Sequence, residues 1–108
     1  MELNQKLISE LIDEAKADEV GLWLVISKLR DVHGIVDPAL IRSTTLDYVR
    51  ALLESGQVVA GYYKPDASGF AEWDKPLPEI ISRINTEWND LRREPDIGDI
   101  VIFVGRPK

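Results

Sequence analysis

The spacing of apolar residues changes at Gly56, and this change limits the possible fold more than any other feature of the sequence. Before Gly56, apolar residues recur every three or four positions, as they do in amphipathic helices. After it, residues 58–63 form a short β-branched and aromatic run that is typical of a strand. A helical first half followed by strands predicts an α+β fold and not an alternating β-α-β array.

Three amphipathic helices and one short helix are expected in the first half. The first includes residues 3–15, and the second follows a cap at Asp18 and ends before Gly34. An Asp-Pro pair predicts a short helix over residues 37–42, because aspartate caps helices and proline tolerates the first helical position. The serine and threonines that follow predict a new cap and a further helix over residues 44–54.

The second half predicts a hairpin, a helix and a last strand. Residues 58–63 and 70–73 have the pattern of two strands joined by a loop of about six residues. Pro78 is placed to open a helix, and Pro95 ends it. The final apolar run, residues 100–104, suits a strand covered on both faces, so we expect it in a central position beside the hairpin.

A single domain, residues 1–108, accounts for the whole chain, since its length is near the commonest domain size and 44% hydrophobic residues suffice for one core. The chain has no cysteine, and its N-terminus has no basic segment before an apolar run. No apolar stretch approaches the roughly 20 residues needed to cross a bilayer. We therefore expect a cytoplasmic protein with no membrane partner.

Residues 22–73 resemble a winged helix-turn-helix in the order of their elements: a helix, a short helix, a further helix and a two-stranded wing. The join from Leu52 to Val58, where a helix stops at Gly56 before the first wing strand, supports the resemblance. The expected fold is thus α+β: a winged-helix-like helical core, a small antiparallel sheet made of the wing hairpin and the C-terminal strand, and an additional helix before that strand. The resemblance implies that the helix over residues 44–54 would lie in a DNA major groove.

The charge of the chain opposes this implied DNA binding. The net charge is -6, and residues 37–75 carry four basic and six acidic side chains. Binding to a phosphate backbone requires an excess of basic side chains. Arg42, Arg50 and Lys64 are the candidate nucleic-acid contacts. A DNA-binding transcriptional regulator is therefore the alternative function, and nucleic acid is a less favoured partner than protein.

The residues that catalysis and metal binding usually need are scarce. His33 is the single histidine, no cysteine is present, and no phosphate-binding or dinucleotide-binding motif occurs. The acidic residues of the first helix read as a solvated face. We expect a protein that is not an enzyme and has no cofactor, no metal site and no catalytic residues.

Aromatic residues of the hairpin supply the candidate interaction surface, which comprises Tyr62, Tyr63 and Trp73. Adjacent residues of a strand point to opposite faces, so one tyrosine is expected to face solvent or a partner. Trp73 stands at a strand end, where it either seals the core or anchors an interface. The leading hypothesis is a non-enzymatic protein-interaction module whose partner is another protein or a second copy of the chain.

A third hypothesis follows from the acidic start of the chain. Residues 1–20 carry six acidic and two basic side chains. Such a face suits an immunity or antitoxin protein that binds a basic toxin.

Several short segments also resemble a group of small uncharacterised bacterial proteins. The resemblance implies a bacterial protein of unknown function, and it supplies no catalytic residues. The segments are Leu22-Trp23, Leu29-Arg30-Asp31, Asp37-Pro38, Glu87-Trp88 and Glu94-Pro95-Asp96-Ile97-Gly98-Asp99.

Overall fold

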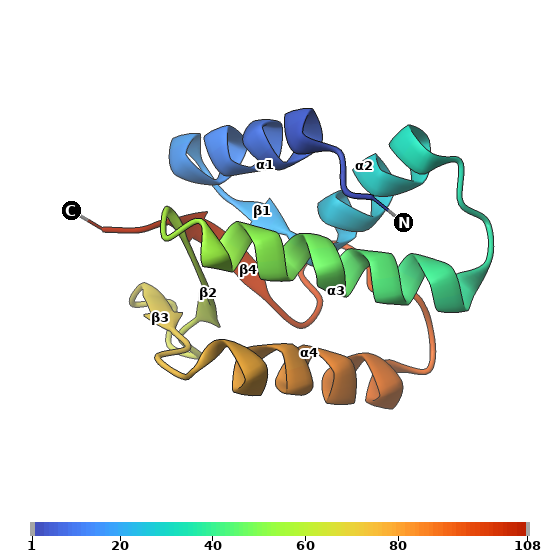
Figure 1. The fold of residues 1–108 in the computed structure, drawn as a ribbon. Helices are drawn as coiled ribbons and strands as arrows, with labels where there is room; N and C mark the ends of the chain where they lie inside the picture. The colour runs from blue at the N-terminus through green and yellow to red at the C-terminus, as the bar shows by residue number, and fades with distance from the viewer. Residues whose placement is uncertain (1, 108) are drawn as a thin grey trace.

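The computed structural model describes residues 2–107 and folds them into four helices and a four-stranded antiparallel sheet, which is an α+β architecture (Figure 1). In chain order the elements are α1 (Gln5–Ala17), β1 (Val20–Gly21), α2 (Leu22–His33), α3 (Pro38–Glu54), β2 (Val58–Tyr63), β3 (Phe70–Glu72), α4 (Leu77–Leu91) and β4 (Ile102–Gly105).

The last strand lies inside the sheet, as its apolar sequence predicts. The strand order is β1-β4-β2-β3, so β4 pairs on one side with β1 and on the other with β2. Phe103 is fully buried and faces Val20 on one neighbour and Ala60 on the other. The predicted start at residue 100 is wrong by two positions. Ile100 has a φ of 67°, which is incompatible with an extended strand.

Helix α3 is continuous, whereas the sequence predicted a short helix over residues 37–42 and a new helix from residue 44. Side-chain hydroxyls explain the difference, because they bond inside the helix instead of capping a second one. Ser43 donates to the Leu40 carbonyl at 3.2 Å, and Thr45 donates to the Ile41 carbonyl at 2.7 Å. The short helix on which the winged-helix resemblance depended is therefore absent from residues 2–107, and that resemblance is not confirmed.

A short edge strand replaces the predicted cap of α2. Gly21, and not Asp18, occupies the cap position of this helix, and β1 lies immediately before it. The strand has two residues, too few to show any periodicity in the sequence. The predicted end of α2 is confirmed, since Gly34 takes a left-handed φ of 64° there.

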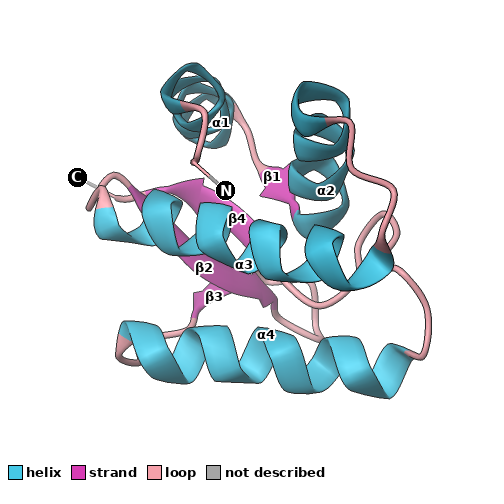
Figure 2. Cartoon of the chain, turned by 45° about the vertical axis from the view of Figure 1, so that its right-hand side comes forward, coloured by secondary structure: helices cyan, strands magenta, loops and turns pink. Residues whose placement is uncertain are grey.

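Helix α3 crosses the middle of the molecule, with α1 and α2 on one side, α4 on the other and the sheet behind it (Figures 1 and 2). The core includes side chains from all four helices and from one face of the sheet. Val20, Phe103 and Ala60 are lateral neighbours on this core face. The residues next to them in the three strands, Gly21, Ile102 and Gly61, form the opposite face.

A buried tyrosine joins three helices. Tyr48 of α3 is fully buried, and its hydroxyl accepts the backbone N–H of Asn4 at 2.8 Å. The same hydroxyl is hydrogen-bonded to Nε2 of His33, at the end of α2, over 2.6 Å. Asn4 in turn caps α1 by accepting the N–H of Leu7. The single histidine thus has a structural partner at a helix end.

Candidate interaction surface

The structure separates the three predicted surface residues. Tyr62 and Tyr63 are 36% and 47% exposed, whereas Trp73 is only 9% exposed and belongs to the core. Both tyrosines are exposed because β2 pairs with β4 only from Val58 to Gly61, so its last two residues extend past that neighbour. Tyr62 and Tyr63 therefore remain available at the surface, while Trp73 seals the core, the first of the two positions predicted for it at this strand end.

Tyr62 is held against the loop that precedes β4. Its hydroxyl donates a hydrogen bond to the carbonyl of Gly98. Next to this contact, Ile97 is 73% exposed. Arg93 and Asp99 form an ion pair that braces the loop, and the 2.6 Å hydrogen bond that Arg93 donates within it lowers the pKa of Asp99. The exposed tyrosine is thus held by a hydrogen bond, and the loop that carries Ile97 is braced by an ion pair.

A groove of about 280 Å³ runs between Trp23 and the two tyrosines; we call it the aromatic groove. Gly21 and Ile102, from the sheet face opposite the core, also line it. The lining residues are Asp18, Glu19, Gly21, Trp23, Leu24, Tyr62, Tyr63, Ile97, Gly98 and Ile102.

Trp23 packs directly on the backbone of β1. A Cβ atom added to Gly21 would lie 2.7 Å from Cδ1 and 2.8 Å from Nε1 of the indole. The absence of a side chain at Gly21 therefore lets the ring lie close to the sheet. Sequence reasoning missed Trp23 as a surface residue. The available signal was its position two residues after a glycine and four after the acidic pair Asp18-Glu19.

The hairpin supports the other side of the surface through aromatic contacts. The ring centroids of Tyr62 and Tyr63 are 6.0 Å apart, and those of Tyr63 and Phe70 are 6.3 Å apart, both in edge-to-face arrangements. The Phe70 ring also covers Gly61, where an added Cβ would lie 2.6 Å from the ring. Tyr63 therefore packs against aromatic rings on two sides.

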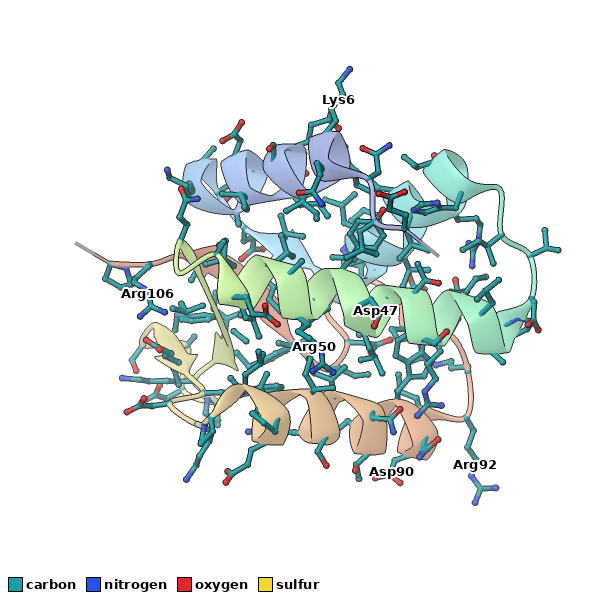
Figure 3. The ribbon with its side chains drawn as sticks, in the orientation of Figure 1. Lys6, Asp47, Arg50, Asp90, Arg92 and Arg106 are labelled. Atoms are coloured by element: carbon teal, nitrogen blue, oxygen red, sulfur yellow. The ribbon has the colours of Figure 1, made fainter. Side chains whose placement is uncertain are left out.

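The candidate nucleic-acid contacts are not brought together as a basic face. Arg42 donates to the side chain and the carbonyl of Asn85 at 2.9 and 2.6 Å, so its guanidinium is used within the fold. Arg50 is exposed on the same helix as the exposed Asp47 (Figure 3). Lys64 lies beyond β2 in the hairpin turn. The outward side of α3 therefore shows one arginine beside an aspartate, a poor pattern for reading DNA.

Within residues 2–107, no group of three or more histidine, aspartate or glutamate side chains is arranged to hold a metal ion. No helix in the same range is long and apolar enough to cross a membrane. Comparisons with known protein families, curated proteins and solved structures give no match. The function must therefore be inferred from the geometry of the chain itself.

Proposed function

We propose that the protein is a non-enzymatic protein-interaction module that binds its partner through the aromatic groove. The observation that carries this proposal is the gathering of exposed Tyr62, Tyr63 and Ile97 beside Trp23, from three separate parts of the chain. Exposed apolar side chains that cluster mark binding sites more often than isolated ones do. Tyrosine and tryptophan are also the residues that contribute most strongly to interfaces.

The groove is organised before any partner arrives, which favours tight binding. Gly21 positions Trp23, the Gly98 carbonyl positions Tyr62, and Phe70 supports Tyr63. Side chains already fixed in the free protein lose little conformational entropy on binding. We place this function in the cytoplasm of a bacterial cell, as the cysteine-free composition and the sequence resemblance suggest.

Site-specific photocrosslinking in cells tests the proposal. A photoreactive phenylalanine analogue at Tyr63 should give a discrete adduct with one partner protein or with a second copy of the chain. The matched control carries the same analogue at Val36, which is 87% exposed but lies between α2 and α3. Trp23→Ala in the Tyr63 protein should abolish the adduct while the circular dichroism spectrum stays native.

Three results would contradict the proposal. One is the absence of any adduct from position 63. Another is the same set of adducts from positions 63 and 36, which would show random collisions. The third is an adduct that persists in a folded Trp23→Ala protein, because the partner would then not use the aromatic groove.

A second candidate, an immunity or antitoxin protein, is favoured by the charge on α1. Glu10, Asp13 and Glu14 are exposed, and none forms an ion pair with another residue between 2 and 107. A free acidic face attracts basic proteins. The neighbouring genes provide the test: this candidate requires an adjacent gene for a basic toxic protein, and a neighbourhood without one argues against it.

A further inference from the structure

We infer that the aromatic groove receives an arginine side chain from a protein partner. This inference rests on the proposed function and specifies the chemistry of the partner. It follows from two features of the molecule: the way the chain uses its other tryptophans, and the acidic side chains that line the groove.

The chain places an arginine over each of its two other tryptophans. The guanidinium carbon of Arg83 lies 3.8 Å from the ring centroid of Trp73, and that of Arg42 lies 5.3 Å from Trp88. Both distances are within the range in which a cation is attracted to an aromatic face. Trp23 has no such partner among residues 2–107, and it is the tryptophan that lines the aromatic groove.

Two carboxylates in the groove are also free to bind a cation. Asp18 and Glu19 line it, and their side chains form no ion pair or hydrogen bond with other residues of the described chain. The basic residue nearest in sequence, Lys16, donates instead to Gln57 at 3.2 Å. No basic residue lines the groove. A cation that enters it therefore meets aromatic rings and negative charge together.

Arginine fits this combination better than lysine does. Its planar guanidinium can stack on Trp23 while its N–H groups donate to a carboxylate at the edge of the plane. A lysine ammonium is a more strongly hydrated point charge, so it gains less from stacking. The net charge of -6 would also attract a basic partner toward the surface.

Calorimetric titration of the full chain with acetylated tetra-arginine amide tests the inference. We expect saturable binding that weakens at least about tenfold in the double variant Asp18→Asn, Glu19→Gln, because charge-assisted hydrogen bonds are lost. The matched control is Glu10→Gln, Asp13→Asn, which removes the same charge from the exposed face of α1 and should bind almost as wild type does. Tetra-lysine should bind more weakly than tetra-arginine.

Two further variants separate the loss of binding from any effect on folding. Asp18 is the C-terminal cap residue of α1, so its replacement affects the helix end as well as the groove. Glu19→Gln alone leaves the cap residue in place and should still weaken tetra-arginine binding. Trp23→Leu should weaken tetra-arginine binding too. Because Trp23 is only half-buried, the melting temperature of this variant should stay above that of the core variant Tyr48→Ala.

Four results would overturn the inference: no saturable binding, equal binding of tetra-lysine, equal loss in the groove and α1 double variants, or full affinity in folded Trp23→Leu. Equal loss in the two double variants would mean that net charge alone attracts the peptide. If the photocrosslink at position 63 still forms in that case, the interaction surface stands and only its preference for arginine is wrong. If the crosslink fails but the preference for tetra-arginine remains, the proposed interaction function is wrong and the arginine site in the aromatic groove stands.

Discussion

Tyr48 and Tyr62 both join separate parts of the chain with a hydroxyl group, yet their surroundings differ completely. Tyr48 is fully buried where α1, α2 and α3 meet, while Tyr62 is 36% exposed at the open end of β2. The first is enclosed by the core, and the second rests on a loop. The comparison shows that one residue type can serve stability in one region and leave an aromatic surface accessible in another.

Replacing each of the two tyrosines with alanine should give the largest difference in the free energy of unfolding. Tyr48→Ala removes a buried ring and leaves the Asn4 N–H without its acceptor, so we expect a loss of about 4 kcal/mol in the free energy of unfolding. Tyr62→Ala should cost about 1 kcal/mol, because its ring is partly solvated already. Urea denaturation followed by circular dichroism measures both. Equal losses would mean that the sheet end is part of the cooperative core.

Gly61 and Gly21 both lie in strands beneath the aromatic groove, but an added Cβ would meet different atoms at each. Gly61→Ala would place a Cβ 2.3 Å from the Ala71 carbonyl oxygen and 2.6 Å from the Phe70 ring. Because the carbonyl belongs to the paired strand, we expect a loss of about 3 kcal/mol in the free energy of unfolding.

Gly21→Ala is the matched control, since its new Cβ meets only side-chain atoms of Trp23 at less than 3 Å. The indole can move, so the expected loss is about 1 kcal/mol, with a shift in tryptophan fluorescence that Gly61→Ala does not require. Urea denaturation and fluorescence spectra check this pair. A larger loss at Gly21 than at Gly61 would show that Trp23 is held as firmly as the backbone.

The fold class and most elements could be predicted because they depend on local patterns. The hairpin, the stop at Gly34 and the central position of the last strand follow from residue types that are close together in the chain. Two helix predictions were wrong: the break within α3 and the cap of α2. Threonine is a favoured cap residue, but in α3 Thr44 and Thr45 are buried and the Thr45 hydroxyl bonds to the preceding turn. A strand of two residues has no pattern to detect.

The candidate surface was only partly predictable, because it depends on contacts between distant segments. The exposure of Tyr62 and Tyr63 follows from where β4 stops pairing, which the sequence does not specify. Trp73 is buried in the core with Arg83 stacked on its ring, and α4 supplies that arginine. Trp23 becomes part of the surface because the fold brings β1 and the end of β2 to one groove. No spacing rule joins residues that are about 40 positions apart.

The smallest expected effect concerns the loop on which Tyr62 rests. The stability of this loop should depend on pH, which distinguishes it from the buried junction of α1, α2 and α3 at Tyr48. Arg93 holds the pKa of Asp99 below its usual value through a hydrogen bond and ion pair. A lowered pKa in the folded state stabilises the loop above the ordinary pKa, and this contribution is lost as pH falls through the lowered value. High salt should weaken it, since Arg93 is exposed.

Arg93→Gln should therefore raise the pKa of Asp99 toward its usual value, as measured by NMR titration of the side-chain carboxyl carbon. Asp66 provides an internal control in the same spectra, because its pKa is also lowered, by hydrogen bonds from Ser68 in the hairpin turn. That pKa should not change in the variant. A shift of both groups would indicate a general change of charge, and a shift of neither would mean that Arg93 does not set the position of the loop. If Asp99 alone responds, the support beneath Tyr62 is electrostatic, in contrast to the packed helices that enclose Tyr48.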